Sequence, residues 1–132
     1  LKELTPRERF AELAPFPVTA TMRLGVIPMG SADGLNWLHA GRVLVRGRTA
    51  PIVSSPSLEH TRVDLSQVPE AQVGDEVVII GRQGNAEITT AEVAKRHGLG
   101  LHHVATTVGP RVTRVYFSGG APVKTVTPAD QT

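Results

Sequence analysis

The chain has 132 residues, no cysteine and a formal net charge of +2. This length predicts one domain that is large enough to bury a hydrophobic core, and the lack of cysteine excludes disulfide bonds and thiolate metal sites. Nucleic-acid binders cluster Lys and Arg on one face and often add aromatic side chains for base stacking. Here the arginines are spread along the chain and aromatic residues make up 4% of it, so we expect no nucleic-acid partner.

No apolar run approaches the roughly 20 residues that a membrane-spanning helix needs, and no signal-like segment opens the sequence. We therefore expect a cytoplasmic protein without a membrane partner. The first residue is Leu rather than Met, and we expect the sequence to be a fragment of a longer protein.

Residues 1–17 predict a connector with a short helix. Thr5 suits the N-cap, Pro6 suits the first helical position, and Glu8 follows three residues after the cap. Two prolines then end the segment. The helix has only one or two turns, so it needs a packing partner to be stable.

From Val18 onward the apolar residues favour short strands. Gly47 lies at the tip of an expected hairpin, where a positive φ is needed. The continuous apolar run at Val77–Ile80 is typical of a strand buried on both faces. We expect strands at Val18–Ile27, Arg42–Val45, Thr49–Ser54, His60–Leu65, Glu76–Gly81, Leu101–Val108 and Val112–Phe117.

One helix is expected, at Thr90–His97, with Thr90 as its cap, Glu92 in its first turn and Gly98 as its stop. The pattern as a whole predicts a mainly β fold, a closed or partly open β-barrel of about seven to nine short strands with this helix. The expected division is a connector at 1–17, the β domain at 18–117 and a loosely ordered tail at 118–132, in which Val123–Val126 is a candidate edge strand.

The chemically suggestive residues have ordinary explanations. His97, His102 and His103 do not have the i, i+4 spacing of helical zinc ligands, so we expect no metal site. Ser57, Glu59 and His60 include the residue types of a hydrolase triad, but such groups normally converge from different elements. No phosphate-binding glycine motif is present. In the loop Met29–Ala40 we expect Trp37 to fill the core rather than to hold a ligand.

A series of motifs resembles the C-terminal β domain of alanine racemases, the fold-type III enzymes that use pyridoxal phosphate. The resemblance covers about Met22 to Phe117. The family's segments Gly-Tyr-Ala-Asp-Gly, Ala-Pro-Ile-Val-Gly-Arg and Cys-Met-Asp-Gln correspond in this chain to Gly30–Gly34, Ala50–Ser55 and Ser57–His60. Its segments Val-Gly-Asp-Glu-Val, Ile-Gly-Arg-Gln-Gly and Arg-Val-x-Arg-Val correspond to Val73–Val77, Ile80–Gly84 and Arg111–Val115.

The resemblance also exposes departures at the family's functional positions. Ser31 stands where the family has a catalytic Tyr that reaches the partner subunit's active site, and a serine hydroxyl is too weak an acid to replace it without a neighbouring base. Pro110 stands at a family Tyr position near the cofactor. Leu58 replaces the Met beside the substrate. We expect Ser31 to be inactive, and Leu58, Glu59 and Asp33 to line the substrate pocket.

The resemblance implies a parent protein whose separate N-terminal barrel carries the Schiff-base lysine. This chain then holds no cofactor itself, although pyridoxal phosphate is expected in the parent. Arg111 and Arg114 are expected to be structural.

Two functions stay open. The first is a C-terminal domain that lines the partner subunit's active site in a homodimeric racemase-like protein and is inactive in isolation. The second is a non-catalytic binding or assembly module that kept the fold. Whether the parent is an active amino-acid racemase is left open by the sequence.

Overall fold

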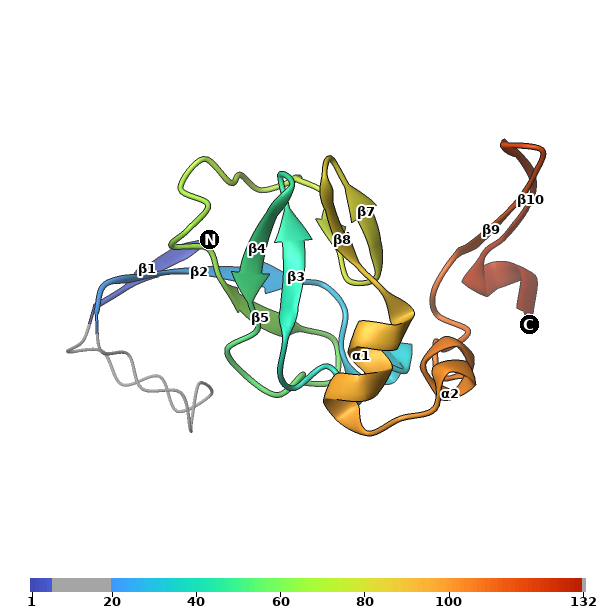
Figure 1. Cartoon of the computed structure of the whole chain (residues 1–132), viewed down its shortest axis with the longest axis horizontal. Helices are drawn as coiled ribbons and strands as arrows, with labels where there is room; N and C mark the ends of the chain where they lie inside the picture. Colours follow the sequence, from blue (N-terminus) through green and yellow to red (C-terminus); the bar gives the residue numbers. More distant parts are fainter. Residues whose placement is uncertain (6–19, 132) are drawn as a thin grey trace.

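The structure is a computed structural model and describes residues 1–5 and 20–131. Within these residues it contains ten β-strands, two α-helices and two 3-10 turns (Figure 1). The predicted helix near the N-terminus, with its cap at Thr5, falls largely outside the described residues. Lys2–Leu4, within the expected connector, forms a strand, β1.

We expected a mainly β fold with a closed or partly open barrel. The mainly β fold is confirmed, whereas the described strands form open antiparallel sheets and no closed barrel. The first sheet has the order β1-β2-β5 and the second β4-β3-β6, while β7-β8 and β9-β10 are hairpins. The bounds are β2 Met22–Ile27, β3 Arg42–Val45, β4 Arg48–Pro51, β5 Thr61–Asp64, β6 Val77–Val78, β7 Gly81–Gln83, β8 Ala86–Ile88, β9 Arg114–Ser118 and β10 Ala121–Val126.

An isolated bridge between Ile52 and Val63 is the ladder contact that joins the first two sheets. The apolar run that we expected to form one doubly buried strand is broken: β6 ends at Val78, and Ile80 is exposed. Gly81 has a φ of 135°, a conformation that L side chains rarely adopt, and it redirects the chain into β7.

The helix prediction is confirmed in its bounds, since α1 spans Thr90–His97. The expected cap was wrong by one residue, because the Thr89 side chain accepts the hydrogen bond from the Glu92 backbone N–H at 3.0 Å. Gly98 ends the helix with a φ of 63°, as predicted.

The strand expected at Leu101–Val108 is wrong, because Leu101–Thr106 forms a second helix, α2. Gly98 and Gly100 turn the chain between the two helices, so the second helix can start at once. Val104 is its single fully buried residue. A single anchor does not produce the apolar periodicity from which a helix is predicted.

The hydrophobic core lies between the first two sheets, the β7–β8 hairpin and the two helices. Trp37 is buried with Leu35 and Leu38, which confirms that it fills the core. The alternation predicted for β5 is also confirmed, because Thr61, Val63 and Leu65 are buried. Other fully buried side chains are Val43, Leu44, Val68 and Ile88.

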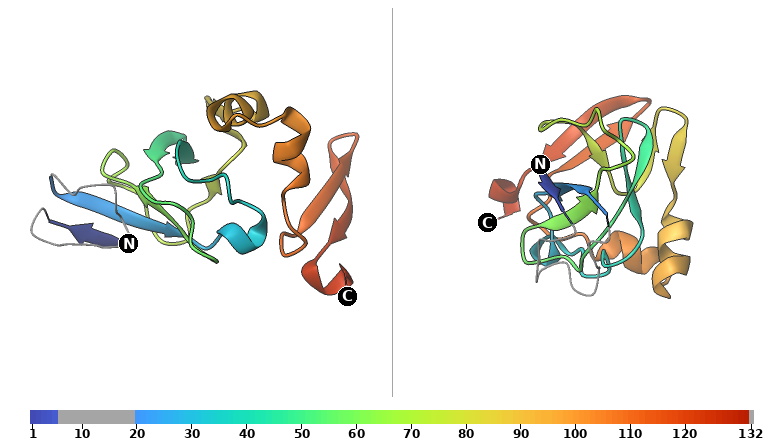
Figure 2. Two further views of the ribbon diagram at one scale, coloured as in Figure 1. Left: turned by 90° about the horizontal axis from the view of Figure 1, so that it is seen from below. Right: turned by 90° about the vertical axis from the view of Figure 1, so that its left-hand side faces the viewer.

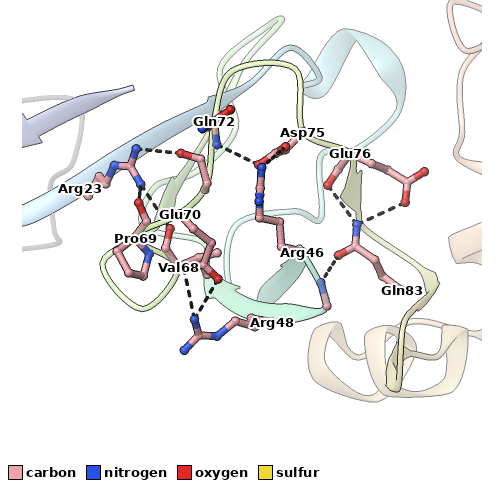
Figure 3. A network of polar contacts seen from close by, with 12 residues as sticks. Arg23, Arg46, Arg48, Val68, Pro69, Glu70, Gln72, Asp75, Glu76 and Gln83 are labelled. Carbon is pink, nitrogen blue, oxygen red and sulfur yellow. Dashed lines mark hydrogen bonds and ion pairs between the residues drawn. The ribbon is translucent and has the colours of Figure 1, made fainter.

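A network of arginines fastens the loop at residues 68–75 to the sheets (Figure 3). The Arg23 guanidinium on β2 donates to the carbonyls of Val68, Pro69 and Ala71. Arg46, at the tip of the β3–β4 hairpin, forms a bidentate ion pair with Asp75, with N–O distances of 2.6 and 3.1 Å. The bond from Arg46 lowers the pKa of the Asp75 carboxyl, and a bond from a backbone N–H lowers it further.

The β9–β10 hairpin lies at one end of the molecule, with α2 between it and the remaining strands (Figures 1 and 2). Gly119 and Gly120 form its turn with positive φ angles. The predicted edge strand at Val123–Val126 is part of β10. Pro128–Gln131 then forms a 3-10 turn. Residues 118–131 therefore include a strand and a 3-10 turn. The three-part division of the chain stays a prediction.

Candidate functional site

The segment Gly30–Gly34 after β2 forms a tight turn that is closed by the side chain of Asp33. The Gly30 N–H donates to Asp33 Oδ2 at 2.8 Å, and the Asp33 N–H donates back to the Gly30 carbonyl at 3.1 Å. Gly34 then reverses the chain with a φ of 87°. Asp33 is buried, so its carboxylate acts as an internal brace for the turn.

A second segment, Ser57–His60, runs against this turn. The backbone N–H groups of Ser31 and Ala32 each donate at 2.9 Å to the carbonyls of Ser57 and Leu58. A Cβ atom on Gly30 would lie 2.3 Å from the Ser57 carbonyl oxygen. Glycine is therefore required at residue 30 for the two segments to meet.

A third segment, Thr107–Arg111, completes the arrangement. The Gly109 N–H donates to the Asp33 carbonyl at 2.8 Å. A Cβ on Gly34 would lie only 1.7 Å from the Thr107 carbonyl oxygen, so this contact also depends on a glycine. Trp37 anchors the same threonine, because its indole N–H donates to Thr107 Oγ1 at 3.0 Å.

Arg111 joins the first two segments electrostatically. Its Nε donates to Asp33 Oδ1 at 3.3 Å and its Nη2 to Glu59 Oε1 at 3.0 Å. These carboxylates raise the pKa of the guanidinium, mainly through the hydrogen bond with Glu59. About half of the Arg111 side chain is exposed, as is that of Glu59, whereas Asp33 is buried.

The structure thus brings Ser31, Asp33, Leu58 and Glu59 together, although they come from two separate loops. Leu58 points its side chain largely into solvent, with 66% exposed. Pro110 lies on the adjacent third segment and is exposed, and its carbonyl accepts a hydrogen bond from Gln131 Nε2 at 2.9 Å. The roles expected for these five residues stay predictions.

The Ser31 hydroxyl is turned toward its neighbouring segment. Its Oγ donates to the Ser57 carbonyl at 3.2 Å, so its proton is held by a backbone acceptor. A general base must carry a suitable pKa and face the proton that it removes. The observed hydrogen bond gives Ser31 a structural role in joining the two loops.

Local sequence patterns do not indicate that Arg111 bridges Asp33 and Glu59. We expected Arg111 and Arg114 to be structural from their motif alone, and Arg114 does donate to the Val108 carbonyl at 2.8 Å. The partners of Arg111 are 78 and 52 residues away in sequence. Such long-range pairing has no local signal.

The residues of this chain do not by themselves fit a pyridoxal-phosphate site. The three lysines, Lys2, Lys95 and Lys124, lie on β1, α1 and β10, outside the three segments of the candidate site. Pro110, which we expected to lie near the cofactor, has no side-chain hydrogen-bond donor.

No group of three or more His, Asp or Glu side chains suited to a metal ion is found among the described residues. His97 instead contacts His39, with ring centroids 4.9 Å apart, and Trp37 at 5.8 Å. Burial lowers the pKa of His97, and the charges of His39 and Arg96 lower it further. No helix in the described part of the chain is long and apolar enough to cross a membrane.

Comparison with known proteins yields consistent relatives. The sequence is 31% identical over 118 residues to the alanine racemase of Halothermothrix orenii, covering 88% of this chain and 31% of that protein. It is 41% identical over 100 residues to the alanine racemase of Desulfosudis oleivorans, covering 74% and 26%. The chain therefore spans about a third or less of the length of these relatives.

Solved structures agree. The alanine racemase of Bacillus anthracis with bound L-Ala-P superposes with a TM-score of 0.88 at 26% identity, covering 99% of this chain and 34% of that one. The biosynthetic alanine racemase of Pseudomonas aeruginosa gives a TM-score of 0.73 at 34% identity, covering 84% and 30%. A sequence model described as "Alanine racemase, C-terminal domain" matches residues 3–116. This match spans most of the chain, which therefore belongs to the alanine racemase C-terminal domain family.

Proposed function

We propose that this chain works as the C-terminal β domain of a larger, pyridoxal-phosphate-dependent protein related to alanine racemases. In this proposal the Gly30–Gly34 turn and the Ser57–Glu59 segment line the active site of the partner subunit in a homodimer. The N-terminal barrel of the parent supplies the lysine and the other cofactor contacts, and the isolated domain is inactive.

The observation that carries the proposal is the mutual bracing of the turn, the Ser57–Glu59 segment and Arg111. Two close backbone approaches, at Gly30 and Gly34, leave no space for a Cβ. Arg111 adds ion pairs to both carboxylates. A site is most precise when its surrounding residues hold it rigidly, and this loop cluster is held in that way at the surface.

The chemistry of the side chains in this loop cluster limits the roles that they could have in an active site. The backbone of the Ser57–Glu59 segment and the exposed Leu58 side chain would shape the substrate pocket and exclude water. Asp33 and Arg111 would keep the turn and this segment in register. The cofactor, when bound to the parent, would stabilise negative charge at the substrate α-carbon, and Ser31 would contribute no proton transfer.

A second candidate function is a non-catalytic binding or assembly module. The replacement of the family's tyrosines by Ser31 and Pro110 favours it. The bracing of the loop cluster favours the first function, because it holds the exposed Leu58 and Glu59 in a fixed position at the surface, as the lining of an active site requires.

The test uses the longer parent protein. It is incubated with pyridoxal phosphate, its absorbance spectrum is recorded, and the D/L ratio is measured after incubation with L-alanine. A cofactor band with D-alanine supports a racemase role. A band without turnover points to another amino-acid reaction, and the absence of a band in a folded parent favours the non-catalytic module.

Replacing Ser31 with Tyr sharpens this test. If the domain lines an active site, a Ser31→Tyr variant should raise the rate of racemisation by the parent, because a phenol is a far stronger acid than a serine hydroxyl. A Ser31→Ala variant is the matched control and should show no gain in rate. No gain in a folded, cofactor-loaded Ser31→Tyr variant would count against an active-site role.

A further inference from the structure

An apolar groove of about 400 Å³ lies outside the three segments of the candidate site. It is formed by β2, β5, the 68–75 loop and neighbouring residues of β3 and β6. Residues of its lining include Leu1, Val26, Val45, Leu65, Val73 and Val77. Close packing of its floor depends on Gly25, because a Cβ there would lie 2.6 Å from Leu65 Cδ1.

The rim of the groove exposes large apolar side chains. Val73 is 86% exposed, Val26 53% and Leu1 50%. Single exposed apolar residues are ordinary, but a contiguous apolar patch around a hollow marks a binding surface.

The loop that carries Val73 is held firmly by the rest of the domain. Arg23 donates to three of its carbonyls, and Arg46 pairs with Asp75. The exposed Val73 is thus presented on a braced loop rather than on a free one. A surface that is already ordered loses less conformational entropy on binding.

The charge in the lining is already neutralised. Asp75 is the ionisable side chain of this described lining, and its carboxylate accepts from Arg46 and from the Gln72 N–H at 2.8 Å. Among the described side chains of the lining, none therefore carries an unpaired charge. The groove fits uncharged, aliphatic or aromatic groups.

The position of Leu1 and the length of the relatives together indicate the occupant. This chain spans about a third of the matched structures, and the family is that of a C-terminal domain. Because Leu1 is in the wall of the groove, any residues that precede it in a longer protein emerge beside the groove. We propose that the groove is the seat of apolar side chains from the domain that precedes this chain in its parent, and is an interface between the two domains.

This inference rests on the proposed function, because it presupposes that preceding domain. It is tested through accessibility rather than activity. The chain has no cysteine, so a Val73→Cys variant carries a single thiol whose reaction rate with a colorimetric thiol reagent can be measured. The same substitution is made in the longer parent, and the signal of the unsubstituted parent is subtracted.

The expected result is fast reaction in the 132-residue chain and reaction at least about tenfold slower in the parent. A Leu101→Cys variant is the matched control, since Leu101 is 58% exposed on α2 and does not line the groove. Its thiol should react equally fast in both proteins.

Three outcomes would overturn the inference. Equal rates for Val73→Cys in both folded proteins would show that the preceding domain does not cover the groove. Protection in the 132-residue chain that increases with protein concentration would assign the groove to a second copy. Protection in the chain itself that disappears after extraction of apolar molecules would assign it to a small apolar ligand. None of these depends on cofactor binding or turnover, so the proposed function is judged separately.

Discussion

The two β-hairpins at β3–β4 and β9–β10 have the same local architecture but opposite surroundings. Val43, Leu44 and Val45 of β3 are all buried, and β3 pairs with β6 on its second edge. In the β9–β10 hairpin every residue is exposed or half-buried, including Tyr116, Phe117 and Val123. Strand formation alone therefore does not reveal which hairpin holds the fold together.

The two hairpins differ in whether the rest of the domain packs against them. An isolated two-stranded hairpin is at best marginally stable in water. The β3–β4 hairpin is covered by the core, and its tip is tied by Arg46 to Asp75 and by the Gly47 N–H to Gln83. Within the described residues, no residue after Val104 belongs to the buried core. Burial, rather than the backbone ladder, separates the two regions.

Truncation of one side chain in each hairpin should give the largest contrast. Leu44→Ala removes a fully buried side chain and should reduce the free energy of unfolding by about 2–5 kcal/mol. Phe117→Ala removes a larger side chain that is 65% exposed, and its effect should stay within about 0.5 kcal/mol. Urea denaturation of the 132-residue chain measures both. A comparable loss of stability in the two variants would mean that the β9–β10 hairpin is also covered.

Two glycines at positive φ extend the comparison to the turns. Gly34 and Gly119 have φ angles of 87° and 58°, so alanine at either should cost about 1–2 kcal/mol in backbone strain. Only at Gly34 does the new Cβ also collide with the backbone of Thr107, whereas nothing lies within 4 Å at Gly119. Gly34→Ala should therefore be clearly the more destabilising in the same denaturation experiment. Equal losses would show that the third segment moves freely away from the turn.

Two arginines, Arg23 and Arg48, should differ in the same way in how much their contacts stabilise the fold. Arg23→Met leaves three carbonyls without their donor, one of them from the buried Val68, and should cost about 1–3 kcal/mol. Arg48→Met breaks an exposed ion pair with Glu70 and should leave the urea midpoint unchanged, because exposed pairs add little. A larger effect from Arg48 would contradict this ranking.

The smallest expected effect is a pH dependence from His97. Burial and the nearby His39 and Arg96 lower its pKa in the folded chain, so the unfolded chain binds the proton more readily. The stability from neutral His97 is complete above its unfolded pKa of about 6.5 and is lost as the pH falls through the folded value. His97→Gln should flatten the stability profile below about pH 6.5. An unchanged profile in His97→Gln would exclude His97 as the source.

Much of the fold could be predicted from local patterns. Period-two alternation identified β5, the glycine at a hairpin tip identified β3–β4, and the Gly98 stop with Glu92 in the first turn identified α1. The helix α2 was missed because one buried residue, Val104, holds it in place. The break after β6 was missed because the apolar run continues through it.

The candidate site divides in the same way. The motifs pointed to Ser31, Asp33, Leu58, Glu59 and Pro110 as members of one site, and four of these residues meet in space. The bridge from Arg111 to Asp33 and Glu59 was invisible to sequence reasoning, because it joins residues far apart in the chain.

The sequence by itself determined which family this chain belongs to and which strands alternate between core and solvent. These properties are local, since they depend on residue identity and short-range periodicity. Only the tertiary structure decided that the sheets stay open, that Gly30 and Gly34 permit close backbone approach, and that the Val73 groove is exposed. These properties depend on contacts between distant segments, whose free energy is set by packing rather than by any single stretch of sequence.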